Sequence, residues 1–196
     1  MKRLIVGISG ASGVIYGIRL LEVLRGVEEI ETHLVMSNAA RRTTLLETDY
    51  TVKDVEHLAD KLYSFNDIAA AISSGSYKTM GMIVIPCAMK TLSGIANSYT
   101  DNLLTRAADV VLKDRRQLVI VARETPLHLG HIQLMAQVTK LGAIIMPPMP
   151  AFYHRPQTLD DIINQTVNRV CDLFDIELGQ DLFERWQGPT YGSDST

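Results

Sequence analysis

The fold is decided by the stretch Leu4-Ile5-Val6-Gly7-Ile8-Ser9-Gly10-Ala11-Ser12-Gly13, in which a short apolar run ends in a glycine-rich turn. Apolar runs with β-branched residues are typical of buried strands. The residues that follow repeat apolar side chains at helical spacing, at Val14, Ile18, Leu21 and Leu24. A strand that passes through a tight turn into a helix is the first half of a βαβ unit. The opening of the chain therefore predicts an α/β domain.

The same alternation continues along the chain. Further strands are predicted at residues 32–36, 82–85, 118–122 and 143–146. Helical patterns cover residues 39–46, 52–62, 103–112, 127–141 and 159–173, the last with Thr158 as its N-cap. Five strands that alternate with helices favour right-handed crossovers and a parallel sheet. We therefore expect a three-layer, doubly wound α/β domain.

Length and composition narrow the class of protein. A chain of 196 residues with 46% apolar and 21% charged residues fits one globular domain, which we expect to span residues 1–187, with a flexible tail at 188–196. The net charge of -3 lacks the basic excess of a general nucleic-acid binder. No apolar run approaches the roughly 20 residues that span a bilayer, and the run after Met1-Lys2-Arg3 is too short for a signal peptide. Two cysteines, Cys87 and Cys171, are too few for a disulfide framework. We expect a cytoplasmic protein without a nucleic-acid or membrane partner.

The glycine-rich turn has the chemistry of a phosphate site. Glycines allow the backbone to approach a ligand, and the helix that follows favours an anion at its N-terminus. However, Ser9 occupies a position that the dinucleotide fingerprint G-x-G-x-x-G reserves for glycine. The second strand ends in Ser37-Asn38, without a carboxylate to bind a ribose. The turn therefore favours a phosphate-bearing ligand such as a flavin over NAD, and a plain βα turn is the alternative.

Polar residues follow the other predicted strands as well. In parallel sheets, ligands bind beyond the carboxyl ends of the strands. Pro86-Cys87 follows the third strand, and Thr91 lies at the start of the next helix, where its hydroxyl can donate to a ligand. Cys87 has no paired histidine nearby in the sequence, so we interpret it as a small buried residue rather than a nucleophile.

Cationic residues gather in the second half of the chain. Arg106 and Lys113 share one face of a predicted helix, although a solvated basic helix would look the same. Arg123 ends a buried strand, where a charge requires a partner. His128 and His131 are spaced as a weak metal pair, but no third ligand accompanies them, so no metal site is predicted.

Together these motifs resemble the UbiX-type flavin prenyltransferases, a family that includes phenylacrylic-acid-decarboxylase-like proteins. The resemblance runs from Arg3 to about Trp186. Its specific parts are the Gly-Ala-Ser-Gly turn, Pro86-Cys87 with Thr91-Leu92-Ser93, Asn102-Leu103-Leu104 with Arg106-Ala107-Ala108-Asp109, Arg123-Glu124-Thr125-Pro126 and Phe152-Tyr153-His154. The resemblance implies a flavodoxin-like (Rossmann-like) domain that assembles into a dodecamer with FMN near subunit interfaces.

The resemblance also implies an activity and a set of site residues. Reduced FMN would receive a dimethylallyl group from dimethylallyl phosphate at N5 and then at C6, without a metal, and the prenylated FMN would pass to a UbiD-type decarboxylase. FMN would be contacted by Gly10, Ala11, Ser37, Thr91 and Arg123, with Arg106 beside the site. The donor phosphate would be clamped by Lys113, Arg123, Tyr153 and Arg169. Ser12 and Glu47 would serve the chemistry, with Glu47 handling a proton as the ring closes. Without the family, Glu47 reads as a solvent-exposed carboxylate at a helix end.

The chain departs from many relatives at two positions near the expected flavin. Ala88 follows Pro86-Cys87 where many relatives carry serine, and Lys90 stands where some carry glycine. Flavin orientation or affinity is therefore expected to differ here. Two other functions remain open from the residues, namely an FMN-dependent acid decarboxylase and a non-enzymatic flavin carrier. The sequence does not name the acid used by the partner decarboxylase. It also leaves phosphate and diphosphate donors open, although one compact cluster of cations favours the monophosphate.

Overall fold

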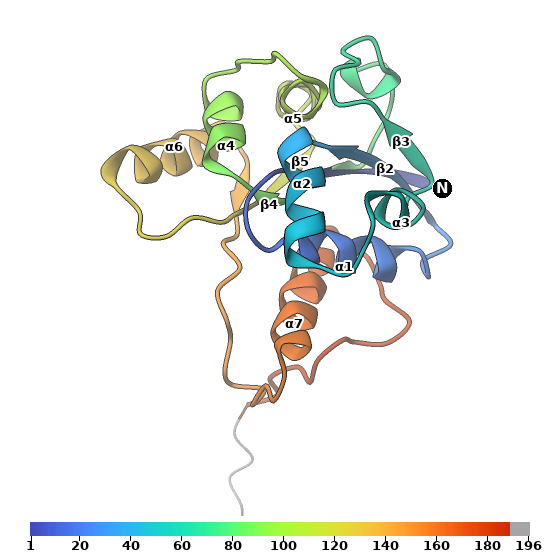
Figure 1. The fold of residues 1–196 in the computed structure, drawn as a ribbon, viewed down its shortest axis with the longest axis vertical. Helices are drawn as coiled ribbons and strands as arrows, with labels where there is room; N and C mark the ends of the chain where they lie inside the picture. Colours follow the sequence, from blue (N-terminus) through green and yellow to red (C-terminus); the bar gives the residue numbers. More distant parts are fainter. Residues whose placement is uncertain (189–196) are drawn as a thin grey trace, which may run out of the picture.

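A computed structural model describes residues 1–188 and has one six-stranded parallel sheet (Figure 1). The strands are β1 (Lys2–Ile8), β2 (Ile30–Met36), β3 (Lys61–Tyr63), β4 (Gly81–Cys87), β5 (Gln117–Ala122) and β6 (Ile144–Ile145). Their order across the sheet is β3-β2-β1-β4-β5-β6, and each neighbouring pair is parallel. This arrangement confirms the doubly wound α/β fold.

Helices cover both faces of the sheet. They are α1 (Val14–Leu24), α2 (Asn38–Glu47), α3 (Val52–Glu56), α4 (Met89–Ala96), α5 (Leu103–Lys113), α6 (Leu129–Lys140) and α7 (Leu159–Asp172), with a short 3-10 helix at Ala71–Ser73. Within residues 1–188, none of these helices is long and apolar enough to cross a bilayer. Thr158 caps α7 through the backbone N–H of Asp161, as its sequence predicts.

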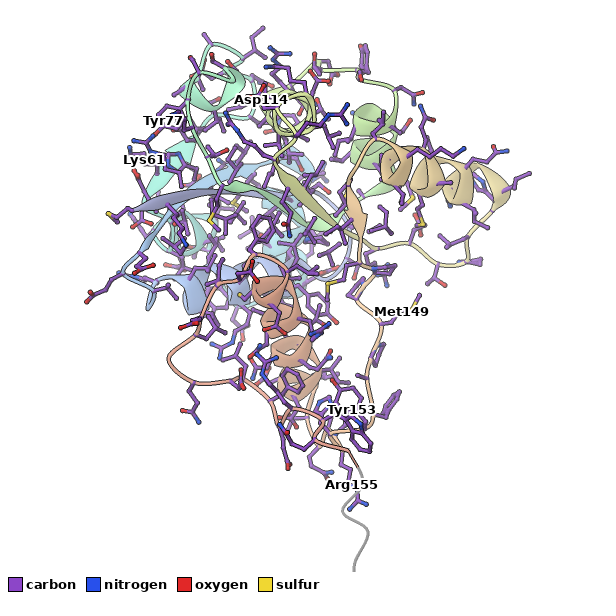
Figure 2. All side chains as sticks on the ribbon, turned by 180° about the vertical axis from the view of Figure 1, so that it is seen from behind. Lys61, Tyr77, Asp114, Met149, Tyr153 and Arg155 are labelled. Atoms are coloured by element: carbon purple, nitrogen blue, oxygen red, sulfur yellow. The ribbon has the colours of Figure 1, made fainter. Side chains whose placement is uncertain are left out.

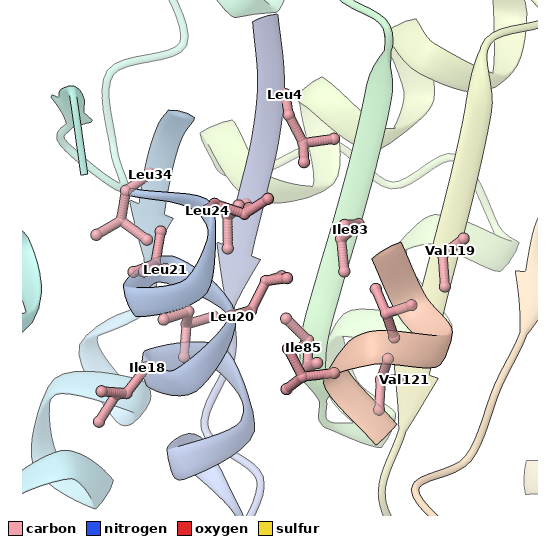
Figure 3. Close-up of a cluster of buried hydrophobic side chains, with 14 of the residues drawn as sticks. Leu4, Ile18, Leu20, Leu21, Leu24, Leu34, Ile83, Ile85, Val119 and Val121 are labelled. Atoms are coloured by element: carbon pink, nitrogen blue, oxygen red, sulfur yellow. The ribbon is translucent and has the colours of Figure 1, made fainter. Parts of the chain in front are cut away.

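Two buried cores follow from the alternation of side chains along the strands. On one face, Leu4, Ile83 and Val121 pack against helices α1 and α7 (Figure 3). On the other face, Ile5 and Met82 pack against helices α4, α5 and α6. Helix α1 lies close to the sheet, because a Cβ added at Gly17 would come within 2.4 Å of the carbonyl oxygen of Ile85. Glycine at this position is what allows the close approach.

The predicted number of strands was wrong by one, because the helix predicted over residues 52–62 ends early. Helix α3 stops at Glu56, and residues 61–63 form the edge strand β3 beside β2. This strand has three residues, and Leu62 is 45% exposed. A segment that is short and half-exposed carries little of the apolar pattern that identifies a strand.

The chain reverses direction across the sheet between β1 and β4. Strands β1 and β4 are neighbours, while β1 and β2 extend the sheet one way and β4 and β5 the other. Connections leave the carboxyl ends of β1 and β4 on opposite faces at this point, which opens a crevice. The glycine-rich turn after β1 therefore lies at the place where such sheets bind ligands.

Candidate functional site

A cavity of about 830 Å³ opens at the carboxyl edge of the sheet. It is lined by Gly10, Ser37, Asn38, Ala39, Phe65, Ala88, Lys90, Thr91, Ser93, Gly94, Asn97, Tyr99, Asp101, Asn102 and Thr105. Helices α2, α4 and α5 all begin among these residues. Their first N–H groups lack partners within the helix and attract an anion. The size, the aromatic side chains and the convergent helix starts fit a flavin mononucleotide.

Two of the residues that line the cavity, Gly10 and Ser37, fix the position of α2 beside it. A Cβ added at Gly10 would lie 2.3 Å from the Cβ of Ala39, so only glycine lets the turn pack against α2. Ser37 caps α2, because its Oγ accepts a hydrogen bond from the N–H of Ala40 at 3.0 Å. The hydroxyl proton of Ser37 is then available to donate to a ligand.

Hydrogen bonds join the strand ends beneath the cavity. The hydroxyl of Ser9 donates to the carbonyl of Pro86 at 3.0 Å and accepts from the N–H of Ala88 at 2.7 Å. Ser9 is fully buried. The N–H of Arg123 donates to the carbonyl of Cys87 at 3.0 Å. The turns after β1, β4 and β5 are therefore held in one fixed arrangement.

Ser12 and Glu47 come together at the mouth of the turn. The Oε2 atom of Glu47 accepts a hydrogen bond from the N–H of Gly13 at 2.8 Å, across 34 residues of sequence. Both side chains are exposed in the single chain. Gly13 has a left-handed conformation, with φ at 93°, which favours glycine. The structure thus places the two predicted chemical groups on either side of Gly13.

Thr91, Ala88 and Lys90 reach the cavity from α4, so the two departures from the family pattern do face the expected flavin. Ala88 is the N-cap of α4 and offers no side-chain hydrogen bond there. Cys87 is fully buried, and this burial raises the pKa of its thiol. A buried, protonated thiol is a poor nucleophile, which agrees with the structural interpretation of this residue.

Arg123 is exposed and directly follows β5, at the carboxyl edge of the sheet. Burial raises the pKa of Tyr16 on α1, and the charge of Arg123 opposes this increase. The charge of Arg123 therefore acts on the first turn of α1, and contact between Arg123 and FMN stays a prediction.

A second cavity of about 570 Å³ lies along the second half of α7. Its lining consists of Tyr153, Gln165, Arg169, Phe183, Arg185 and Trp186. The ring of Tyr153 meets that of Trp186 edge to face at 6.2 Å, and its hydroxyl oxygen accepts from Gln165 at 3.3 Å. Two of the four residues predicted to clamp a phosphate, Tyr153 and Arg169, therefore share one aromatic and cationic pocket.

Two other predicted cations lie elsewhere in the single chain. Lys113 pairs with Asp114 at 2.7 Å, and Figure 2 shows Asp114 and Tyr153 at opposite ends of the molecule. Arg106 donates to the carbonyl of Ser73 at 3.2 Å and to Asp109 at 3.0 Å. Helix α5 begins at the flavin cavity and runs toward the amino end of β5. Lys113 is its last residue, so the length of the helix separates Lys113 from the cavity. A role for Lys113 and Arg106 in ligand binding stays a prediction.

The rings of His128 and His131 are stacked at 3.6 Å, and Nδ1 of His128 accepts from the N–H of Gly130 as the cap of α6. Among residues 1–188, no group of three or more His, Cys, Asp or Glu side chains is arranged to hold a metal ion. His128 thus caps the start of α6, with the ring of His131 stacked on it.

Comparison with known proteins decides the family. The Flavoprotein family model matches residues 1–171. The flavin prenyltransferase UbiX of Escherichia coli K12 is 69% identical over 96% of this chain and 100% of its own. The chain belongs to the flavin prenyltransferase family. The enzyme of the same name from Thauera aromatica is 58% identical over 95% of this chain and 94% of its own.

Solved structures of the family agree with the fold. A crystal structure of AnUbiX (PadA1) in complex with FMN and dimethylallyl pyrophosphate has a TM-score of 0.92 and 50% identity, covering 95% of this chain and 98% of its own. A dodecameric FMN-dependent UbiX-like decarboxylase from Escherichia coli O157:H7 has a TM-score of 0.91 and 51% identity, covering 95% and 100%. The peptidyl-cysteine decarboxylase EpiD, at 18% identity and a TM-score of 0.58, shares the fold alone. The flavodoxin-like fold and the flavoprotein assignment are thereby confirmed.

Several residues at the two cavities escaped the sequence interpretation. At the flavin cavity these are Phe65, Tyr99, Asn102 and Thr105, and at the second cavity Gln165, Phe183 and Arg185. Asn102 had a local signal, because it caps α5 through the N–H of Thr105 at 3.0 Å. Phe65 comes from the loop after β3, the strand that the sequence analysis missed.

Replacing Ser37 with alanine tests its double role. The Ser37→Ala variant loses the cap of α2, which costs about 1 kcal/mol of stability. It also loses a hydroxyl donor at the cavity, so FMN should bind roughly tenfold more weakly. Thermal denaturation and fluorescence titration with FMN measure the two effects.

Thr51→Ala is the matched control, because Thr51 caps α3 by the same kind of bond, in which its hydroxyl oxygen accepts from the N–H of Asp54. This variant should lose a similar stability and keep its FMN affinity. Equal FMN affinities of the two variants would remove Ser37 from the flavin site.

Proposed function

We propose that the chain joins a dimethylallyl group from dimethylallyl phosphate to N5 and then C6 of reduced FMN. The observation that carries this proposal is the pair of cavities, one bounded by helix N-termini and one by aromatic rings and arginine side chains. The first fits a flavin phosphate and the second fits an allylic phosphate. The co-crystal of AnUbiX with FMN and dimethylallyl pyrophosphate supports this pairing of ligands.

The flavin cavity would hold FMN as a substrate of the reaction. Gly10, Ala11, Ser37 and Thr91 would contact it from the turn, α2 and α4, with Arg123 close to the turn. The reduced flavin supplies the electron-rich atoms that attack the allyl group. The protein's part is to orient the flavin, and the buried bridge at Ser9 keeps the contributing turns in register.

The second cavity would assist departure of the phosphate. As the allylic C–O bond breaks, negative charge gathers on the phosphate, and Arg169 and Tyr153 are positioned to donate to it. Donors fixed in advance stabilise that charge most in the transition state. The ring face of Trp186 would stabilise the positive charge that develops on the allyl group.

Glu47 and Ser12 would serve proton transfer. Closure of the new ring at C6 releases a proton, and Glu47 is a carboxylate held against the glycine-rich turn by the N–H of Gly13. We propose that Glu47 accepts this proton and that Ser12, its neighbour across Gly13, donates a hydrogen bond at the reacting side of the flavin.

The site would be completed by assembly into a dodecamer. Large apolar side chains are exposed in the single chain, among them Leu46 at 82%, Met149 at 72% and Phe152 at 71%. Such exposure marks contact surfaces, and the relative from Escherichia coli O157:H7 is described as dodecameric. We propose that Lys113 of a neighbouring copy, with Arg123, completes the set around the donor phosphate, and that Arg106 lies beside FMN.

The product would be prenylated FMN, and a UbiD-type decarboxylase would receive it. We place the reaction in the cytoplasm, because both cysteines are buried free thiols, and burial raises the pKa of Cys171 to about 12. One FMN-binding domain over residues 1–187 is consistent with a single sheet between two cores. The tail proposed at 188–196 falls, after Gly188, outside the described residues.

Anaerobic incubation with reduced FMN and dimethylallyl phosphate tests the activity. The flavin should gain the mass of one dimethylallyl unit, detected by mass spectrometry. A parallel incubation with dimethylallyl pyrophosphate compares the two donors. An unchanged flavin mass with both donors contradicts the proposal and leaves a flavin carrier. Release of carbon dioxide from an aromatic acid by the chain alone favours the decarboxylase.

Replacing Glu47 with glutamine separates binding from chemistry. Glu47→Gln keeps an oxygen that can accept from Gly13, so FMN should bind within about twofold of the wild type. Without the carboxylate, turnover should fall by roughly 100-fold or more, because general acid–base groups contribute on this scale. Single-turnover rates at saturating substrates provide the measurement, and a wild-type rate would exclude Glu47 from proton transfer.

A further inference from the structure

Asp172, at the end of α7, lies between two arginines of the second cavity. Its Oδ2 atom accepts from Nη1 of Arg169 at 2.9 Å and from Nη1 of Arg185 at 3.0 Å. Its Oδ1 atom accepts from Nη2 of Arg185 at 2.7 Å. Both arginines line the cavity in which we place the donor phosphate. One carboxylate is therefore shared between two cations at the edge of an anion site.

The two arginines use their donors very differently. Arg185 grips Asp172 with two nitrogens and also donates to Asp181, from Nε at 2.6 Å and from Nη2 at 2.7 Å. Four of the five N–H groups of its guanidinium are thus engaged by carboxylates. Arg169 shows a single bond to a carboxylate among the described residues, to Asp172, and its side chain is 47% exposed. Arg169 therefore keeps most of its donors for a ligand, and Arg185 does not.

The contact between Arg185 and Asp172 limits how Asp172 can bind Arg169. A carboxylate binds an arginine most strongly through two parallel bonds. Here Arg185 already forms this bidentate contact with Asp172. Arg169 therefore makes only one hydrogen bond to Asp172, at Oδ2. Freed from Arg185, Asp172 could turn to Arg169 and make the paired contact there. Asp172 would then occupy the donors that a phosphate needs.

Asp172 carries its negative charge at every neutral pH, so it can always compete with a phosphate for Arg169. Hydrogen bonds from Arg185 are the chief cause that lowers the pKa of the Asp172 carboxyl, followed after burial by its attraction to Arg185 and its bond to Arg169. The carboxyl is therefore ionised throughout the neutral range and repels a phosphate unless its charge is balanced. Arg185 supplies that balance.

We propose that Arg185 is a positioning residue for the donor site, which restrains Asp172 so that Asp172 orients Arg169 without competing with the phosphate. This inference rests on the proposed placement of dimethylallyl phosphate in the second cavity. Arg185 acts through Asp172 rather than on the substrate, so its loss should raise the dissociation constant of the donor and leave that of FMN unchanged.

A simpler role for Arg185 gives a different expectation. Arg185 lies next to Trp186 and two residues from Phe183, so its bonds also tie the end of the described chain to α7. If tying this segment were its whole function, removing Asp172 as well could not repair the loss. If restraint of Asp172 is its function, removing Asp172 should repair it.

The test is a calorimetric titration of the FMN-loaded protein with dimethylallyl phosphate, which measures the dissociation constant of the donor. Arg185→Gln should weaken donor binding by about tenfold, the scale of one charge-assisted hydrogen bond. The double variant Arg185→Gln with Asp172→Asn should recover affinity to within about threefold of the wild type. Asp181→Asn is the matched control, because it removes the other carboxylate and leaves the contact with Asp172. Its donor affinity should stay within about twofold.

Three outcomes overturn the inference. A double variant as weak as Arg185→Gln alone shows that Arg185 ties the segment instead. Wild-type affinity in Arg185→Gln shows that Asp172 is not a competitor. Absence of dimethylallyl phosphate binding in the wild type, with FMN still bound, removes the proposed donor site itself. FMN affinity, measured for each variant, identifies any that fails to fold.

Discussion

The hydroxyl of Ser9 is the contact on which the rest of the site depends. It bridges the turn after β1 and the turn after β4, as donor to Pro86 and acceptor from Ala88. These strands are neighbours at the point where the sheet reverses direction, so the bridge spans the crevice in which parallel sheets bind ligands. A buried hydroxyl that both donates and accepts fixes its partners, because moving them apart would leave a polar group in the interior without its hydrogen bond, which is costly. The same residue removes the dinucleotide fingerprint from the turn. One side chain thus both shapes the flavin cavity and distinguishes it from an NAD site.

In the proposed reaction, the two cavities would meet different chemical demands. The flavin cavity uses backbone N–H groups and small residues, which present a fixed surface to a flat ring system and its phosphate. The second cavity uses arginines, tyrosine and tryptophan, which meet a charge that grows during reaction. Glu47 is bound to the N–H of Gly13, in the glycine-rich turn after β1. In the proposed assembly, exposed apolar side chains of neighbouring copies would pack together and bring the two cavities into one site.

The parts of the fold that depend on local chemistry could be predicted from the sequence. The turn after β1 and the helix caps at Thr158 and Asn102 follow from residue type at fixed spacing. Strand β3 could not be predicted, because three half-exposed residues form a strand only when β2 is beside them. The bond between Glu47 and Gly13 has no local signal either, since it depends on how α2 packs on the turn.

The position of Lys113 shows a further limit of sequence patterns. Helical periodicity places Lys113 on the same face as Arg106, but seven residues of helix rise about 10 Å along its axis. That rise places Lys113 away from the carboxyl ends of the strands, where the flavin cavity lies, and beside Asp114. Periodicity gives the face of a helix and says nothing of which copy of the chain that face will meet. Lys113 can therefore serve the site only through assembly.

The dissociation constant of FMN for the Ser9→Ala variant tests the central claim most directly. Alanine fits the same space but leaves the N–H of Ala88 without its acceptor and the carbonyl of Pro86 with only the bond from the backbone N–H of residue 9. We expect FMN binding about tenfold weaker than in the wild type, with unchanged secondary structure by circular dichroism, and recovery in Ser9→Thr, which restores the hydroxyl. Wild-type FMN affinity in Ser9→Ala would contradict the account, because the flavin site would then not depend on the bridge between β1 and β4.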